Sequence, residues 1–206
     1  MNLGADNGLR LRRAASSVPH GLPDRQIAIL TGASGTGKTT TCGRLLDRAR
    51  DLGLDCAGVL SPARVDGGAK VGIDVVDVRT EERRRLAEVD ELPGGIRLGP
   101  YRFDDEAVAW GAAALGVACP CDILFVDEIG PLEMNRGEGW VNALDALRVG
   151  QYRLAVVVVR ASLIDAVREA VGAPATVRVR PCLEPGREGL RELLSLVELV
   201  ALTREP

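Results

Sequence analysis

The feature that most constrains the fold of this 206-residue chain is a glycine-rich turn between a strand and a helix. Residues 26–32 (QIAILTG) predict a buried strand, and residues 38–53 predict a helix that ends at Gly53. Between them, residues 32–39 (GASGTGKT) match the pattern G-x-x-x-x-G-K-[S/T] in full. The glycines let the backbone curl so that successive N–H groups point at phosphate oxygens, and the helix N-terminus adds its dipole. The turn therefore predicts a phosphate-binding loop.

Two side chains of this loop have separate predicted tasks. Lys38 is expected to reach the β- and γ-phosphates of a nucleotide as a catalytic cation, and Thr39 to bind Mg²⁺. The alternative is a glycine-rich turn that ends in Lys-Thr by chance, but the flanking strand and helix favour phosphate binding. The predicted nucleotide-binding set is Gly32, Ala33, Ser34, Gly35, Thr36, Gly37, Lys38, Thr39 and Thr40.

Short apolar runs alternate with helical patterns along the rest of the chain. A DGG turn at 66–68 makes residues 70–78 part of a β-hairpin insertion. Apolar strands separated by helices favour an α/β fold, a mainly parallel sheet with helices on both faces. The other predicted strands are 55–61, 121–128, 152–160 and 176–180, and the other predicted helices are 104–118, 139–150, 162–172 and 189–202.

The length of the chain suits one domain with a substantial core and is short for two. We expect residues 1–23 to form a flexible leader and residues 24–203 to form a single domain. The leader carries Arg10, Arg12 and Arg13 without an apolar core, which is unlike a secretory signal.

Composition and charge argue against several kinds of partner. Lys and Arg total 26 and Asp and Glu total 29, so the net charge is −3 and no basic surface for nucleic acid is indicated. Aromatic residues make up 3%, which is few for stacking single-stranded nucleic acid. No run of roughly 18 apolar residues predicts a membrane span. We therefore expect neither nucleic acid nor a membrane as a partner, and the sequence indicates no particular protein partner.

The cysteines indicate the compartment. There are five, an odd and scattered set, as in a reduced cytoplasmic protein. Cys119 and Cys121 could bind a metal, but no second cysteine pair or histidine cluster accompanies them, and the sole histidine is His20. We favour a packing role for both cysteines at a helix-to-strand junction.

A second chemical signal is the apolar strand at 121–128, which ends in two adjacent carboxylates, Asp127 and Glu128. Burying a carboxylate is costly unless a cation or a reaction requires it. A strand that ends in Asp downstream of a phosphate loop usually supplies an acidic site for Mg²⁺, so Asp127 is predicted to hold the metal together with Thr39.

The pair of acids resembles the RecA-like group of phosphate-loop proteins, which hydrolyse nucleotides with an additional catalytic glutamate. That resemblance implies that Glu128 orients the attacking water; the alternative is a helix-capping or surface acid. In the RecA-like arrangement the strand after the acidic strand lies beside the phosphate-loop strand. Arg160 ends that strand (154–159), so it is expected near the γ-phosphate as a third catalytic residue, unless it is only solvated.

Four segments together are similar to the small nucleoside-triphosphatase family that includes the cancer-related nucleoside-triphosphatase. The resemblance spans most of residues 26–171 and predicts a P-loop NTPase fold of the RecA-like type. Its departures are SPAR at 61–64, where only Arg64 matches the family pattern, Pro131 at a usual lysine, and Ile73 at a usual phenylalanine. The segments are GASGTGKTTT; GVLSPARVDGGAKVGIDVVDV followed by RTEERRRLA; LGPYRFDDEAV; and FVDEIGPLEM, with Glu128, Gly130 and Glu133 in place.

The family resemblance implies Mg²⁺-dependent hydrolysis of ATP, GTP and other nucleoside triphosphates to diphosphates, with weak base selectivity. The absence of Asn-Lys-x-Asp disfavours a dedicated GTPase switch. Two other functions stay open. One is a nucleotide-binding adaptor for a cofactor-assembly enzyme. The other is a small-molecule kinase, in which the β insertion and residues 99–103 (GPYRF) form an acceptor site. Fold alone does not decide among them.

Overall fold

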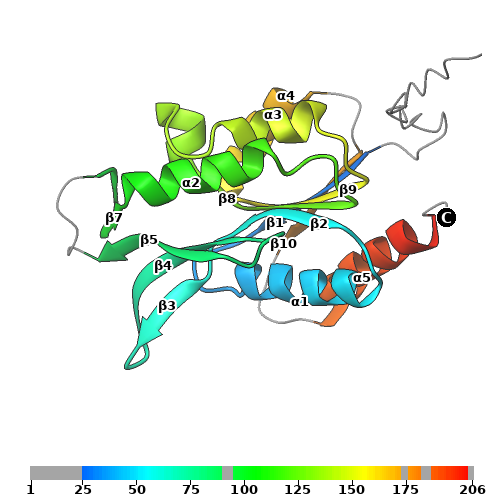
Figure 1. The fold of residues 1–206 in the computed structure, drawn as a ribbon, viewed down its shortest axis with the longest axis horizontal. Helices are drawn as coiled ribbons and strands as arrows, with labels where there is room; N and C mark the ends of the chain where they lie inside the picture. Colours follow the sequence, from blue (N-terminus) through cyan, green and yellow to red (C-terminus); the bar gives the residue numbers. More distant parts are fainter. Residues whose placement is uncertain (1–24, 90–94, 173–175, 182–186, 204–206) are drawn as a thin grey trace, which may run out of the picture.

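The structure is a computed structural model that describes residues 25–89, 95–172, 176–181 and 187–203. The predicted leader, residues 1–23, lies outside these ranges. Within them, one ten-stranded sheet has the order β10-β1-β9-β8-β2-β4-β5-β7-β6, with β3 paired to β4 (Figure 1). The strands are β1 (Gln26–Thr31), β2 (Cys56–Leu60), β3 (Ala63–Asp66), β4 (Ala69–Asp77), β5 (Arg83–Val89), β6 (Arg97–Leu98), β7 (Tyr101–Phe103), β8 (Ile123–Ile129), β9 (Leu154–Val159) and β10 (Thr176–Pro181).

Helices cover both faces of the sheet (Figure 1). On one face lie α2 (Asp105–Gly116), α3 (Asn142–Val149) and α4 (Ile164–Val171), and on the other lie α1 (Lys38–Asp51) and α5 (Arg187–Leu202). Two short helices, the π-helix η1 (Leu132–Arg136) and the 3₁₀ helix η2 (Ala161–Leu163), follow β8 and β9.

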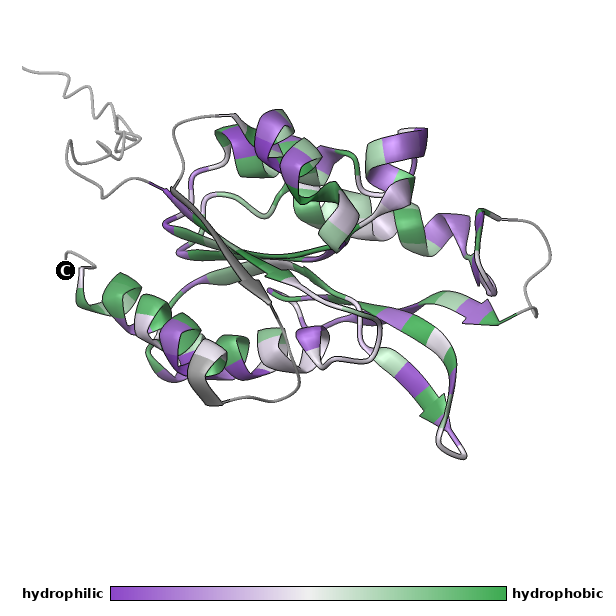
Figure 2. Cartoon of the chain, turned by 180° about the vertical axis from the view of Figure 1, so that it is seen from behind, coloured by the Kyte–Doolittle hydropathy of each residue, from purple (hydrophilic) through white to green (hydrophobic). Residues whose placement is uncertain are grey.

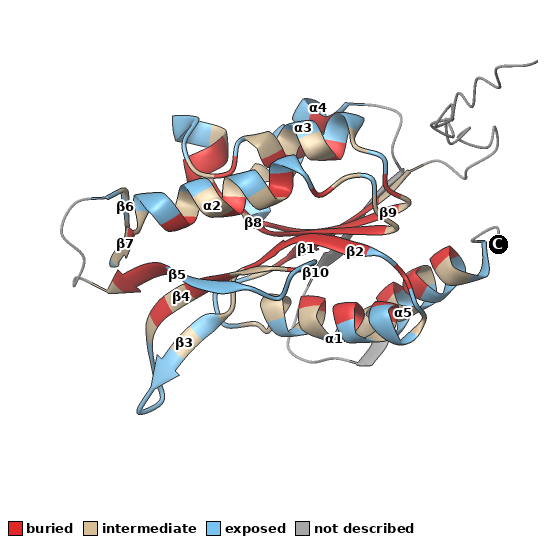
Figure 3. Cartoon of the chain, viewed as in Figure 1, coloured by how far each residue is buried: buried red, intermediate tan, exposed pale blue. Residues whose placement is uncertain are grey.

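Five strands, β10, β1, β9, β8 and β2, form the parallel half of the sheet. In β8, Ile123 and Phe125 pack with α1 and α5, whereas Leu124 and Val126 pack with the helices of the opposite face. All of β9 is buried, and the apolar residues of β1, β2, β8 and β9 fill the middle layer in Figures 2 and 3. Burial on both faces accounts for the continuous apolar runs. The α/β fold with helices on both faces is confirmed; the sheet is mixed, with parallel strands in its core and antiparallel strands from β4 to β6.

The order of the strands decides which loops meet. β9 lies between β1 and β8, as the RecA-like arrangement requires. Because these strands are parallel, their carboxyl ends lie at one edge of the sheet, where ligands bind in open α/β sheets. The loop after β1, the acids that end β8 and the arginine after β9 therefore meet there.

The antiparallel half, β4, β5, β7 and β6 with β3 against β4, is larger than the hairpin expected from the sequence. β4 lies at 69–77 rather than 70–78, and the strands β5, β6 and β7 were not predicted. β5 begins with three exposed arginines and buries only its later residues, so its sequence lacks the alternation of an ordinary half-buried strand.

The helix predicted at 139–150 is wrong at its start. α3 begins at Asn142, and residues 132–136 form η1 instead of a loop. Gly137 and Gly139 adopt positive φ values of 64° and 69° between the two helices, which separates them. The other helices and strands differ from their predicted bounds by at most a few residues at their ends.

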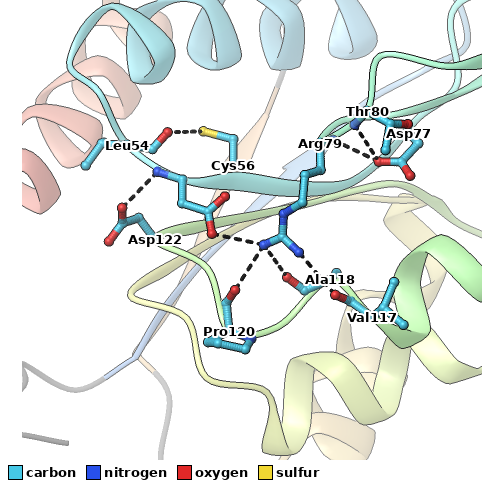
Figure 4. Close-up of polar contacts among 10 residues, drawn as sticks. Leu54, Cys56, Asp77, Arg79, Thr80, Val117, Ala118, Pro120 and Asp122 are labelled. Atoms are coloured by element: carbon cyan, nitrogen blue, oxygen red, sulfur yellow. Dashed lines mark hydrogen bonds and ion pairs between the residues drawn. The ribbon is translucent and has the colours of Figure 1, made fainter. Parts of the chain in front are cut away.

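The connection from α2 to β8, which carries Cys119 and Cys121, is held by one arginine (Figure 4). The guanidinium of Arg79 donates to the carbonyls of residues 117, 118 and 120 at 3.0–3.2 Å and to Asp55 Oδ2 at 2.9 Å. Both cysteines are free, and a hydrogen bond from Cys121 lowers the pKa of Cys119 to about 7. In the part of the chain that the structure describes, no three His, Cys, Asp or Glu side chains form a metal-binding group.

No helix within the described ranges has the length and apolar character needed to cross a membrane.

Candidate active site

A cavity of about 690 Å³ opens at the edge where the parallel strands end. Its wall brings together most residues that the sequence singled out. Gly32, Ala33 and Thr36 do not line it, although the first two contact Lys38 from behind the loop. The predicted site residues on the wall are Ser34, Gly35, Gly37, Lys38, Thr39, Thr40, Asp127, Glu128 and Arg160.

The loop between β1 and α1 has the shape that the glycines predicted. Gly35 and Gly37 both have a φ of 83°, which strains any residue with a Cβ, and Gly37 is the N-cap of α1. No described side chain caps this helix, which leaves the N–H groups of its first turn available to an anion, and the first three residues of the helix line the cavity. The ammonium of Lys38 donates to the carbonyls of Gly32 (3.0 Å) and Ala33 (2.7 Å), across the loop.

Asp127 is the buried acid of the site, with 2% of its surface exposed. Burial raises the pKa of its carboxyl from 3.8 to about 6, although hydrogen bonds from the Thr39 hydroxyl and the Ser61 N–H lower it. Ser61 donates its N–H to Asp127 Oδ2 at 3.2 Å and its hydroxyl to the Asp127 carbonyl. Ser61, at the end of β2, therefore fixes the acid from the neighbouring strand.

The oxygens of Thr39 and Asp127 suit Mg²⁺ chemically. Mg²⁺ prefers hard oxygen ligands and is commonly held by one or two protein groups together with phosphates and water. A carboxylate that is buried beside a hydroxyl and within the field of Lys38 needs such a cation to offset its desolvation. The donor set thus fits the metal.

Glu128 and Arg160 come together as an ion pair at the ends of β8 and β9. Arg160 Nε donates to Glu128 Oε1 at 2.8 Å. The side chain of Glu128 is 31% exposed and that of Arg160 is 55% exposed, and both line the cavity. The ladder between β8 and β9 is irregular between Asp127 and Ile129, which allows the adjacent acids to face different neighbours.

Glu133 has a role that the sequence alone did not reveal. The residue is 9% exposed, and its carboxylate accepts from the N–H of Gly130 (2.9 Å) and of Trp140 (3.1 Å). Burial raises its pKa, and these N–H groups oppose that shift. Glu133 thereby holds the segment from β8 to α3 against the cavity. The available signal was a lone acid between Leu132 and Met134, in a stretch otherwise expected to be buried.

Arg64, the other arginine suggested by the family resemblance, does not line the cavity. It donates to Glu88 Oε1 at 2.5 Å and lies 3.9 Å from Asp74 Oδ1, on the β3–β5 surface. The cations that the antiparallel half places on the cavity wall are Lys70 and Arg83, which the sequence reading did not single out.

Known proteins resemble this chain in sequence and in fold. Residues 27–179 match the model of a family described as NTPase. The nucleoside-triphosphatase THEP1 of Caldivirga maquilingensis is 33% identical over 109 residues, which cover 53% of this chain and 61% of that protein. THEP1 of Ignicoccus hospitalis is 36% identical over 105 residues, with coverage of 51% and 59%. The chain thus spans about three fifths of the length of these curated relatives.

Two solved structures share the fold. The human cancer-related nucleoside triphosphatase gives a TM-score of 0.63 at 22% identity, over 88% of this chain and 100% of that chain. THEP1 from Aquifex aeolicus gives 0.62 at 19% identity, over 84% and 99%.

Proposed function

Given that the chain belongs to the NTPase family, we propose that it is a Mg²⁺-dependent nucleoside-triphosphatase that converts ATP, GTP and other nucleoside triphosphates to diphosphates and phosphate. The observation that carries this proposal is the meeting of three groups on one cavity wall. These are the phosphate loop with Lys38, the oxygens of Thr39 and Asp127, and the Glu128 carboxylate.

Each residue has a defined task in the proposed reaction. The loop N–H groups and the Lys38 ammonium bind the phosphate oxygens, which fixes the triphosphate before reaction. Thr39 and Asp127 would hold Mg²⁺, which neutralises phosphate charge when bound. Ser61 keeps the Asp127 carboxylate in place through the bonds described above.

Glu128 orients the attacking water and accepts its proton as the water oxygen bonds to the γ-phosphorus. Arg160 holds one oxygen of Glu128 in the structure, and in the reaction its guanidinium also faces the charge that develops on the transferred phosphoryl group. The phosphoryl group passes to water, and the nucleoside diphosphate leaves.

We place this activity in the cytoplasm. The cysteines that the structure describes, Cys42, Cys56, Cys119 and Cys121, are all free, as expected in a reducing compartment.

A small-molecule kinase is the second candidate. It is favoured by one observation: the β insertion and the end of the GPYRF segment, through Ile73 and Phe103, line the same cavity as the phosphate loop. A kinase would form product only with an acceptor present, whereas a hydrolase releases phosphate in water alone. Phosphate release from a panel of nucleoside triphosphates, with and without Mg²⁺, separates the two.

The decisive variant is Glu128→Gln, which keeps the size of the side chain but removes its charge. We expect nucleotide affinity within a few-fold of wild type and single-turnover phosphate release slower by roughly 10²–10⁴, the usual scale for loss of a general base. Glu138→Gln is the matched control, since Glu138 is a surface acid that pairs with Arg136 and does not line the cavity. Wild-type turnover in Glu128→Gln would refute the hydrolytic mechanism.

A further inference from the structure

Part of the cavity wall is made of apolar side chains, and we call this part the apolar lobe. It is contributed by both halves of the molecule: β4 to β7 on one side, and α2, η1 and the segment before α3 on the other. The residues that define it are Ile73, Leu86, Leu98, Phe103, Val108, Leu132 and Trp140.

The position of the apolar lobe relative to the phosphates decides what it can bind, and this step rests on the proposed function. Lys38, Thr39 and Asp127 hold the triphosphate, with its γ end toward Glu128. The nucleoside is attached at the opposite end of the phosphate chain. In the sheet order, β4 to β7 lie beyond β8 and β2, whereas the phosphate loop follows β1 on the other side of β8. The apolar lobe therefore lies on the Glu128 side of the phosphate loop, away from the nucleoside end. A nucleoside triphosphate bound in this way therefore does not fill the apolar lobe, and another molecule can bind there.

The wall of the lobe is built before any ligand binds. Trp140 is 4% exposed, and its indole Nε1 donates to the carbonyl of Val108 at 3.1 Å. A Cβ at Gly111 would lie 2.7 Å from that nitrogen, so the indole occupies space that only glycine leaves open. Glu133 fixes the backbone N–H of the same tryptophan at 3.1 Å. A preformed apolar wall with a few polar groups is typical of small-molecule sites.

One cation stands at the rim of the lobe. Lys70, an exposed residue of β4 that lines the cavity, holds its ammonium 4.9 Å from the centre of the Tyr101 ring. None of the carboxylates within the described ranges forms an ion pair with it. By contrast, Arg83 and Arg160, the other cavity cations outside the phosphate loop, are already paired with Asp74 and Glu128. Lys70 is thus the rim cation available to an anion.

We propose that the apolar lobe is a second ligand site, which takes a small molecule with an apolar body and one anionic group while a nucleotide occupies the phosphate loop. The body of the ligand contacts Leu98, Phe103 and Trp140, and its anion pairs with Lys70.

The test uses two fluorescent probes of similar shape. Anilinonaphthalene sulfonate carries one anion on an apolar body, and N-phenyl-1-naphthylamine lacks the anion. The chain has two tryptophans, so Trp110→Phe leaves Trp140 as the sole donor for energy transfer to a bound probe. We expect transfer to both probes, with tighter binding of the sulfonate. Lys70→Met should weaken the sulfonate roughly two- to fivefold, as for an exposed ion pair, and leave the neutral probe unchanged.

A matched pair of leucine variants locates the probe. Leu98→Asp places a charge in the apolar lobe at a half-buried position and should abolish energy transfer. Leu199→Asp changes a leucine on α5 that is 44% exposed and lies outside the cavity, and it should bind both probes as before. Equal binding by the two variants would show adventitious adsorption and overturn the proposal, as would a sulfonate affinity that does not respond to Lys70→Met.

Simultaneous binding is tested with Mg²⁺ and a non-hydrolysable nucleoside triphosphate. The probe should stay bound when the nucleotide saturates the protein; competition between them would assign the lobe to the nucleoside and overturn the proposal. Because neither measurement involves hydrolysis, the two proposals fail separately. A protein that binds probe and nucleotide together without releasing phosphate would contradict the hydrolase and support the second site.

Discussion

The parallel and antiparallel halves of the sheet contribute different things to the same cavity. From the parallel half come the phosphate loop and the charged groups at the ends of β8 and β9. From the antiparallel half come the strands that line the apolar lobe, and Lys70 at its rim. Groups proposed for phosphate chemistry therefore stand at the ends of strands that are covered on both faces, whereas β4 and β5, which line the second site, are exposed over part of their length.

The difference follows from how each half is buried (Figure 3). β9 is buried along its entire length, which fixes its end tightly, whereas β3 has only one residue that is not exposed. Catalytic groups need precise positions, and a covered sheet supplies them. The antiparallel half instead keeps its two buried acids, Asp74 and Glu88, paired with arginines near the surface. Substitutions in the two halves should therefore separate activity from stability.

After Glu128→Gln, the largest effect on turnover is expected in the phosphate loop. Lys38→Ala removes the cation that binds the phosphates, and turnover should fall by roughly 10²–10³, the usual scale for losing one preorganised donor, with weaker nucleotide binding. Steady-state phosphate release and equilibrium nucleotide binding measure the two effects. Arg44→Ala, at an exposed position on the same helix and outside the cavity, is the control and should behave as wild type. Unchanged turnover in Lys38→Ala would remove the loop from the mechanism.

The same contrast explains what the sequence could predict about the fold. The strands of the parallel half are continuous apolar runs because both faces are covered, so 26–31 and 154–159 were recognisable from composition alone. β5 was missed because its arginines contact tertiary partners, such as Asp74 for Arg83 and the Trp110 ring for Arg84, rather than following a pattern along the chain. η1 was missed because its five residues are too few to show a helical period; Gly137 ends it and Glu133 anchors it through the N–H of Trp140.

The site could be predicted to a similar extent. The loop motif and the acidic strand lie in short contiguous stretches, so Lys38, Thr39 and Asp127 could be named before their meeting was visible. Ser61 and Lys70 carry no local signal, since their relevance comes from contacts across strands to Asp127 and from the shape of the cavity.

The next largest effect is expected at Asp127, whose buried carboxylate lowers the stability of the fold and is proposed to hold Mg²⁺. Its pKa lies near 6 in the fold instead of 3.8, so the fold favours the protonated acid. The stability this provides is fully present below pH 3.8 and is lost as the pH rises through 6. At about 1.4 kcal/mol per pKa unit, the buried carboxylate costs about 3 kcal/mol at neutral pH.

Asp127→Asn removes that cost. Without Mg²⁺ and nucleotide, its free energy of unfolding should exceed that of wild type by about 3 kcal/mol at pH 8, and the gap should narrow as the pH falls toward 5. Metal-dependent nucleotide binding and hydrolysis should both weaken. Urea unfolding in the presence of a chelator, at several pH values, measures the gap. A gap that stays constant with pH would mean that the charge of Asp127 is not its source.

Arg160 should show a smaller effect, confined to the reaction. Arg160→Ala should slow phosphate release by roughly 10- to 100-fold, the scale of a lost hydrogen bond to a charged group, and weaken nucleotide binding much less. Its ion pair with Glu128 is largely exposed, so the melting temperature should stay near that of wild type. Single-turnover rates and thermal unfolding of one preparation test both statements. A normal maximal rate would show that Arg160 is a solvated surface arginine without a part in the reaction.

Arg64 in the antiparallel half should give the opposite result, with the smallest effect on turnover. Its guanidinium faces Glu88 and Asp74, which are each 7% exposed, and it is absent from the cavity wall. Arg64→Ala deprives these buried acids of a cation. Part of the loss is offset, because Arg85 remains 3.2 Å from Glu88 and Arg83 remains 3.4 Å from Asp74.

We therefore expect Arg64→Ala to lower the free energy of unfolding by about 1–2 kcal/mol, toward the lower end of the cost of leaving a buried polar group short of a partner. Phosphate release per folded molecule should stay within about twofold of wild type, since Arg64 touches no part of the reaction. Arg85→Ala is the control: with 69% of its side chain exposed, Arg85 should contribute well under about 1 kcal/mol. If Arg64→Ala kept its stability but lost turnover, Arg64 would have to act at the phosphates. The antiparallel half would then also contribute to phosphate chemistry, contrary to the comparison drawn above.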